Sequence, residues 1–591
     1  MTTRDRVSLE FTGLDEGVGE LTWGQRFVWN ILQSLAPANH YLNIRFRVHL
    51  PSDVTRERVL AALHTLVRRH DVLRTRFPVG PDGEPEQHCD ASGDLPVEIC
   101  RTDPGRVRRL AEQDEERLWR EPFRHEAEWP LRVSVIVAGG RPRQVVFVFS
   151  HLAADAWGCS VLRREFLDLL RSDRAAPALA GWRPLARAEF ELSPPGRDAN
   201  DRSLAYWRRV LETTPQTAFP TLQEAGESPR FPGLGLHSVA LAAAAQAVAA
   251  RHRVGPAAVL LAALSTIIGI RTGTDIVPLF LAAGNRFTPV DAASVGTFYQ
   301  GAPVLTRLDT GSLAGTIRNA HQVSTLAYLR GQSDPRDVAR LLDTVNHRRG
   351  LDIDLSSTVN VVPEPGAAGP PPTIRDVAEL RELTASTRVS DLEGRDSERL
   401  KLYLHVKSLR SRAVIELFCD SRYLTAPAAR QALAGLELVL IELLEAGDLS
   451  IDRVADLVGI APLARPRSCV AVDNCWIDVD AVRGLLGDLP ETVAAQAFVV
   501  GPDDGPARLV AYVVAAQPTT PERLHAALLR RLDGHLSMTP QWYVVCRTAP
   551  ARPESRAEWE RQPVLLQGSG RAGGQLADTD STPSIDAHRG A

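Results

Sequence analysis

Lysine is nearly absent from this sequence of 591 residues, in which only Lys401 and Lys407 occur. Almost every positive charge is therefore an arginine, and acidic residues outnumber basic ones slightly, to give a net charge of -4. The two signs are mixed along the chain and no basic stripe is evident. Nucleic acid is therefore not expected as a partner.

Closely spaced cysteines and long apolar runs are also missing. The seven cysteines are scattered without any Cys-x-x-Cys pair, so the sequence indicates neither a zinc site nor a disulfide framework. We expect free, buried thiols in a reducing cytoplasm. The longest apolar stretch, near 257–270, is too short to span a bilayer and predicts a buried helix. No apolar signal region begins the sequence, so a soluble protein without membrane contact is expected.

Signatures of cofactor binding are absent as well. The sequence has no P-loop, no dinucleotide fingerprint and no Gly-Gly-x-Ser site at which a carrier domain holds phosphopantetheine. We therefore expect that the chain itself binds no metal and no cofactor.

The length and the changes in composition predict several domains of mixed α/β (α+β) class. Two α+β blocks are expected at 1–180 and 181–460, joined by a linker rich in Pro, Arg and Ala at 175–203. A separate small α/β domain is expected at 469–567. The tail at 568–591 is almost free of apolar residues and is expected to be disordered.

Local patterns predict individual elements in the first block. Thr22 and Gln25 form a capping box that begins a helix, and the apolar spacing at 55–70 predicts a second helix. The continuous apolar run at 145–149 is typical of a central strand that is covered on both faces. In the second block, a long amphipathic helix is expected at 426–445.

The segment Ser-His-Leu-Ala-Ala-Asp-Ala at 150–156 carries the candidate chemistry. A neutral imidazole at the end of a buried strand can accept a proton, or hold a nucleophile, near neutral pH. Taken alone, however, the segment favours a structural interpretation. His151 would then simply end a core strand, and Asp155 would cap the following helix.

Several segments together resemble the condensation domains of nonribosomal peptide synthetases, which belong to the chloramphenicol acetyltransferase-like superfamily. HLAADA resembles the family's His-His-x-x-x-Asp-Gly signature. Further matches follow the family's order over about 20–450: ELTWGQRFVWNILQ, RRHDVLRTRF, GNRF, VGTFYQGAPV and STVNVV. The resemblance implies two lobes that form a V with a central tunnel.

The resemblance also implies roles for individual residues. His151 matches the second histidine of the signature, which orients or deprotonates the attacking amine. Asp155 matches the structural aspartate, for which Arg74 is the expected partner. Three further residues are expected near the tunnel: Trp157, Gln300 and Asn360.

Three residues depart from the family pattern. Ser150 stands in place of the first signature histidine, Ala156 in place of the glycine, and Gln300 in place of a motif asparagine. Ala156 puts in doubt any backbone angle that only glycine permits.

Three functions remain open. The chain is expected to be an acyltransferase that joins a thioester on a peptidyl or acyl carrier protein to an amine or hydroxyl, with phosphopantetheine supplied by the carrier. The alternative is an inactive platform that recruits carrier proteins or tailoring enzymes. A third possibility is direct use of a coenzyme A thioester.

The segment after Cys469 resembles the small C-terminal subdomain of adenylating enzymes. In that family a Gly-Lys pair contacts the acyl-adenylate, whereas Ser555 and Arg556 stand here and no lysine follows Lys407. Arginine is not a simple substitute for that ammonium. We therefore expect a degenerate module with a docking or stabilising use.

Overall fold

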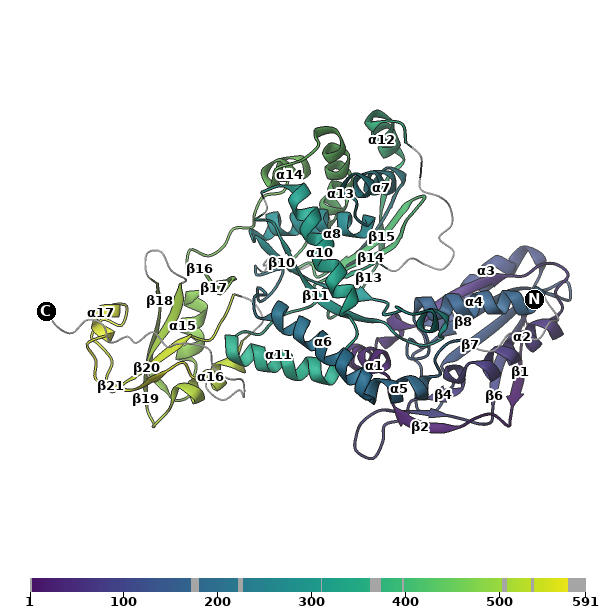
Figure 1. Ribbon diagram of the computed structural model, residues 1–591, viewed down its shortest axis with the longest axis horizontal. Coiled ribbons are helices and arrows are strands. Elements are labelled where there is room, and N and C mark those ends of the chain that lie inside the picture. The colour runs from purple at the N-terminus through teal and green to yellow at the C-terminus, as the bar shows by residue number, and fades with distance from the viewer. Residues whose placement is uncertain are drawn as a thin grey trace. The chain divides into compact units, whose positions relative to one another are not determined.

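The structure is a computed structural model that describes 3–171, 180–221, 227–309, 311–361, 372, 374–395, 398–501, 507–532 and 536–571. It divides the chain into two compact units (Figure 1). The larger unit consists of Met1–Leu211, Thr221–Ala339 and Leu355–Leu463. The smaller unit consists of Glu212–Pro220, Arg340–Asp354 and Ala464–Ala591. Most of the expected disordered tail lies outside the described residues.

The first lobe of the larger unit is built on a five-stranded sheet. Its strands lie in the order β1 (Thr3–Phe11), β6 (Gly93–Arg101), β7 (Leu131–Ala138), β8 (Arg141–Phe149) and β3 (Ile44–His49). A small three-stranded sheet accompanies it, in the order β2 (Gly17–Glu20), β5 (Glu86–Cys89) and β4 (Thr75–Arg76). The predicted apolar strand is thus β8, which pairs antiparallel with β7 on one side and β3 on the other.

Both faces of the five-stranded sheet are covered by helices. Alternate residues of β8 point to opposite faces, so that Phe147 and Phe149 join one core while Val146 and Val148 join another. The helices α2 (Arg56–Arg69) and α4 (Ala156–Arg171) pack into the first core, and α3 (Val107–Arg120) packs into the second. The expected capping box begins α1 (Trp23–Leu35).

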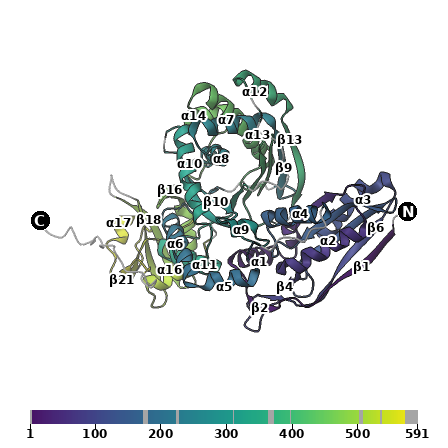
Figure 2. The same cartoon turned by 45° about the vertical axis from the view of Figure 1, so that its right-hand side comes forward.

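The second lobe contains a seven-stranded sheet. Its strands lie in the order β11 (Gln300–Arg307), β10 (Ile276–Ala283), β12 (Ser357–Asn360), β14 (Leu402–Leu409), β15 (Ala413–Cys419), β9 (Phe231–Ser238) and β13 (Arg388–Arg395). Figures 1 and 2 show helices gathered beside this sheet. They are α7 (Val239–His252), α8 (Pro256–Thr272), α10 (Leu313–Leu329), α12 (Val377–Leu383), α13 (Ala426–Ala446) and α14 (Ile451–Val458).

The expected apolar helix is α8, whose residues from Ala258 to Ile270 are all buried. No single described helix is long and apolar enough to cross a membrane, although α7 and α8, bent by 104°, pass that test together. All seven cysteines are free, as expected, and all but Cys469 are buried.

Residues 175–179 of the expected linker lie outside the described residues, and most of the remainder is helical, which corrects the prediction. α5 (Pro184–Leu192) lies within it, and α6 (Pro194–Leu211) begins within it and continues beyond residue 203. Proline stands at the start of both helices, where its missing N–H costs no hydrogen bond. α5 also buries Arg187 and Glu191, which pair with each other at 2.9 Å. The composition therefore concealed two helices, of 9 and 18 residues.

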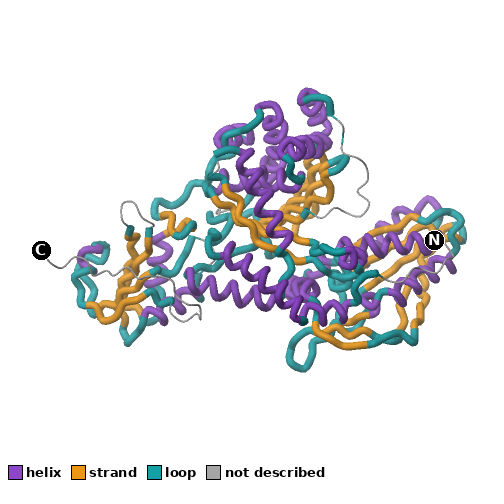
Figure 3. Tube along the Cα trace, in the orientation of Figure 1, coloured by secondary structure: helices purple, strands orange, loops and turns teal. Residues whose placement is uncertain are grey.

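The smaller unit has its own four-stranded sheet, drawn in orange between purple helices in Figure 3. The strands lie in the order β18 (Thr492–Val500), β19 (Arg508–Ala515), β20 (Trp542–Cys546) and β21 (Val564–Gly568). The remaining elements are the paired strands β16 (Cys469–Val472) and β17 (Cys475–Asp478), with α15 (Val479–Gly487), α16 (Pro521–Leu529) and α17 (Arg556–Trp559).

Two segments from earlier in the sequence complete the smaller unit. Arg349, at the end of α11 (Pro335–Arg349), is buried and pairs with Asp473 at 2.8 Å. The Thr539 N–H donates to the Gly350 carbonyl at 2.9 Å. This unit is therefore not built from one continuous stretch of sequence, unlike the module expected at 469–567.

Candidate active site

The candidate histidine lies in a tight loop between β8 and α4. β8 ends at Phe149, and α4 begins at Ala156. Asp155 caps this helix, as the sequence predicts, because its Oδ1 accepts a hydrogen bond from the Gly158 N–H at 2.8 Å. The loop is therefore held at one end by the sheet and at the other by the helix cap.

Asp155 also connects the loop to the second lobe. Its Oδ1 lies 2.8 Å from Nη2 of Arg286, and its Oδ2 accepts from the Phe298 N–H at 3.0 Å. The side chains of Asp155 and Arg286 are only 7% and 4% exposed. Because a buried carboxylate without a partner is costly, this ion pair fixes the position of the loop.

The structure corrects the expected pair of Asp155 with Arg74. Arg74 is buried, but its Nη2 donates to Asp71 at 2.7 Å and its Nη1 donates to the Asp15 carbonyl at 2.6 Å. It therefore holds together segments of the first lobe. The true partner, Arg286, belongs to the GNRF segment, which offered a signal in the form of an arginine without an assigned role.

The His151 ring has one enclosed nitrogen and one accessible nitrogen. Nδ1 is buried and accepts or donates no hydrogen bond among the described side chains and backbone groups. Nε2 is not enclosed in this way, and the residue as a whole is only partly buried. Nε2 is therefore the nitrogen that a substrate could reach.

Burial lowers the pKa of His151, while the Asp155 carboxylate and the residue's own backbone act in the opposite direction. The lowered pKa keeps the imidazole neutral near pH 7, as a general base requires. The His151 carbonyl accepts a hydrogen bond from the Thr297 hydroxyl, so the second lobe also holds the backbone of this residue.

Ser150, which stands in place of the first signature histidine, pairs with another histidine. Its buried Oγ lies 2.9 Å from Nε2 of His125 and accepts from the Leu152 N–H at 3.3 Å. Burial lowers the pKa of His125 to about 4, so that ring is neutral. No sequence pattern pointed to His125, which precedes β7 and lies 25 residues before Ser150.

Ala156 causes no backbone strain in place of the family's glycine. It is the first residue of α4, and its φ is not positive. The backbone at this position therefore does not require a glycine. The neighbouring Trp157 is 50% exposed, and its Nε1 donates to the Ala292 carbonyl at 2.9 Å. Trp157 thus lies at the surface, and its place near a tunnel stays a prediction.

Gln300 and Asn360 are both buried but differ in what their amides bind. Gln300 uses both ends of its amide on the backbone of Ser333, at 2.6 and 3.2 Å. Asn360 donates to the Tyr403 hydroxyl at 3.0 Å, whereas its Oδ1 is buried without a partner among the described residues. The Gln300 amide is therefore used in holding the fold, whereas Oδ1 of Asn360 remains able to accept a hydrogen bond.

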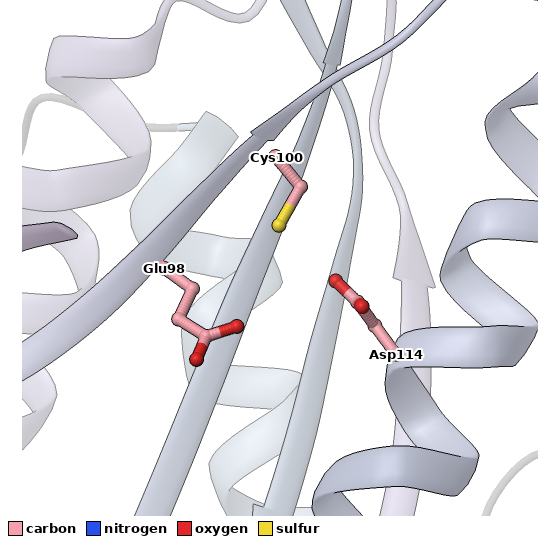
Figure 4. A group of neighbouring side chains, drawn as sticks. All are labelled: Glu98, Cys100 and Asp114. Atoms are coloured by element: carbon pink, nitrogen blue, oxygen red, sulfur yellow. The ribbon is translucent and has the colours of Figure 1, made fainter. Parts of the chain in front are cut away.

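One group of side chains among the described residues has the composition of a metal site (Figure 4). Glu98, Cys100 and Asp114 lie together in the first lobe. Arg4 contacts both carboxylates, at 3.0 Å for Glu98 and 2.5 Å for Asp114, and Arg117 also pairs with Glu98. Burial raises the pKa of Cys100 to about 11, so its thiol stays protonated. The carboxylates are already neutralised, and the residues do not fit a metal ion.

Comparison with known proteins decides the family. Residues 16–341, more than half of the chain, match the family described as the condensation domain. The chain belongs to the condensation domain family. It is 26% identical over 413 residues to the phosphinothricin tripeptide synthetase PhsC of Streptomyces viridochromogenes. That match covers 66% of this chain but only 36% of PhsC, so the chain spans about a third of this relative.

Solved structures share the condensation domain fold. The condensation domain of the monacolin K polyketide synthase MokA has a TM-score of 0.58 at 16% identity, covering 74% of this chain and 99% of that domain. The X-domain in the complex with OxyB from teicoplanin biosynthesis has a TM-score of 0.56 at 17% identity, covering 76% and 97%. These likenesses confirm the chloramphenicol acetyltransferase-like α/β fold.

The likeness of the C-terminal segment to an adenylating enzyme stays a prediction. The family match ends at residue 341, before most of the smaller unit. Arg556, expected over the catalytic lysine position, begins α17 and forms a half-exposed ion pair with Glu560 at 2.8 Å. Its guanidinium is thus engaged at the surface of the smaller unit.

Proposed function

We propose that this chain is a condensation-type acyltransferase. It would join an aminoacyl or acyl thioester, held on the phosphopantetheine of a carrier protein, to an amine or a hydroxyl. The observation that carries the proposal is the neutral His151 imidazole with an accessible Nε2, in a loop that Asp155 and Arg286 fix between the lobes. An inactive fold has no need of such a base.

The reaction needs one base and correct placement of the reactants. The amine nitrogen attacks the thioester carbonyl carbon, and His151 Nε2 takes the proton that the nitrogen loses. The carbon–sulfur bond then breaks, and the leaving thiolate receives that proton to become a free thiol. A thioester is reactive enough that positioning supplies much of the remaining rate. The products are an amide and a free thiol, which together contain all the atoms of the amine and the thioester.

The alternative proposal is a platform without catalysis. Two observations favour it: Ser150 replaces the first signature histidine, and a structural neighbour, the X-domain of teicoplanin biosynthesis, was solved with OxyB bound. Ser150 is compatible with either proposal, because its hydroxyl forms a hydrogen bond with His125 and accepts one from the Leu152 N–H.

One experiment separates these proposals. Purified chain is mixed with an acylated carrier protein and an amine, and intact mass follows the acyl group on the carrier. We expect transfer with the wild-type chain and no transfer with His151→Ala at an unchanged circular dichroism spectrum. Equal transfer by both proteins would overturn the acyltransferase proposal. A parallel reaction with acyl coenzyme A shows whether the carrier protein is needed.

A further inference from the structure

Tyr299 is a neighbour of His151 that no family motif assigned a role. It occupies the variable position between Phe298 and Gln300 in the segment VGTFYQGAPV, directly before β11. The centroids of the Tyr299 and His151 rings are 5.4 Å apart, with 49° between the ring planes. A phenol from the second lobe therefore lies beside the candidate base of the first.

The backbone on the N-terminal side of Tyr299 is fixed to the His151 loop. The Phe298 N–H donates to Asp155, and the Thr297 hydroxyl donates to the His151 carbonyl. The ring itself packs against Phe27, with centroids 5.7 Å apart. These contacts restrict where the hydroxyl can lie, which is the condition for a preorganised hydrogen-bond donor.

The hydroxyl of Tyr299 is unoccupied by other protein groups. It hydrogen-bonds to none of the residues that the structure describes, yet it is not among the enclosed polar atoms, so solvent reaches it. Burial of the ring raises the pKa of Tyr299, and the nearby Tyr403 adds to the effect. The phenol therefore stays protonated and can donate a hydrogen bond wherever His151 is neutral.

Resting on the proposed function, we propose that the Tyr299 hydroxyl is a catalytic hydrogen-bond donor to the reacting carbonyl oxygen. When the nucleophile bonds to the carbonyl carbon, an electron pair of the C=O bond moves to that oxygen. Tyr299 would stabilise the resulting negative charge, while His151 Nε2 holds the proton from the nucleophile. The pair returns to reform the C=O bond as the thiolate leaves, so Tyr299 gains and loses no proton.

The test compares Tyr299→Phe with Tyr206→Phe in the carrier-protein assay. Tyr206 supplies a matched control, because its buried hydroxyl donates to the Pro303 carbonyl on β11 and lies outside the proposed site. Removal of one donor of this kind lowers kcat by about 100-fold or more. We expect that loss for Tyr299→Phe with little change in KM, and near wild-type kcat for Tyr206→Phe.

The outcomes separate the two proposals. If His151→Ala is inactive but Tyr299→Phe keeps wild-type kcat, the role of Tyr299 is overturned and the acyltransferase proposal stands. If His151→Ala keeps full activity, both fall.

Discussion

Nη2 of Arg286 lies 2.8 Å from Oδ1 of Asp155, and this buried ion pair connects the two lobes at the loop that carries His151. Arg286 also donates to the carbonyls of Asp291 and Ser294, at 2.6 and 2.9 Å. The same guanidinium thus orders the segment before β11 and the loop after β8. Arg286 therefore supports both the loop position and the lobe contact, together with the hydrogen bonds from Phe298 and Thr297 to the loop.

Substitution of Arg286 is expected to destabilise the larger unit strongly. Arg286→Met leaves the Asp155 carboxylate buried without its charged partner, which costs about 3–5 kcal/mol. The control is Arg307→Met, because Arg307 pairs with Asp309 in a half-exposed position where the expected change is below about 1 kcal/mol. Urea unfolding measures both. Equal stability of Arg286→Met and the wild type would contradict the structural role.

The pH dependence of transfer should report the lowered pKa of His151. An ordinary histidine, with a pKa of 6.5, loses half of its base form at that pH. Because burial lowers the pKa of His151, we expect the acid limb of kcat/KM to be centred below pH 6.5. The pH profile of the wild-type chain tests this. An acid limb centred above 6.5 would be incompatible with a buried base.

The smaller unit should lose stability in acid through His525. Burial lowers its pKa from 6.5 to about 4. Below pH 6.5 the unfolded chain therefore binds a proton that the folded chain does not, and stability falls until the pH nears 4. The loss amounts to about 3 kcal/mol over that window.

Unfolding followed at pH 7 and pH 5 measures the effect of His525. The variant His525→Gln should weaken the pH dependence, whereas the exposed His237 offers a control in His237→Gln. The same pH dependence in all three proteins would rule out His525 as its source.

Gly350 is expected to tolerate no side chain. Its φ is +67°, and an added Cβ would overlap Oγ1 of Thr539 in the smaller unit. Gly83 has a similar φ of +84° but open space around it. Gly83→Ala should therefore cost roughly 1–2 kcal/mol for its backbone alone. Gly350→Ala should lose roughly 1–3 kcal/mol more through overpacking. Equal losses of stability for the two variants in thermal unfolding would show that the Thr539 side chain moves aside at no cost.

The sequence predicted those features that depend on local order. The capping box at Thr22, the strand that ends at Phe149 and the helix cap at Asp155 follow from short patterns, and all three are confirmed. The family resemblance supplied the fold. The partner of Asp155 could not be predicted, because Arg286 lies 131 residues away and many arginines compete for that role.

Other parts of the site depend on tertiary packing alone. His125 contacts Ser150, and Tyr299 contacts His151, only because separate segments meet at the end of β8. The helices α5 and α6 were hidden by a composition that is typical of linkers. Burial and pairing, which decide both cases, leave no periodic signal in a single sequence.

The smaller unit is built from three separate segments of the sequence, and this fixes the order in which the two units can be completed on the ribosome. Glu212–Pro220 emerges roughly 240 residues before Ala464, the first residue of the last segment that it must join. At about 5–20 residues per second, that interval lasts roughly ten to fifty seconds. The last residue of the larger unit, Leu463, directly precedes Ala464, so synthesis of the larger unit is complete before the last segment of the smaller unit begins to emerge. The two early segments of the smaller unit therefore lack their packing partners until the strands after Ala464 have been synthesised.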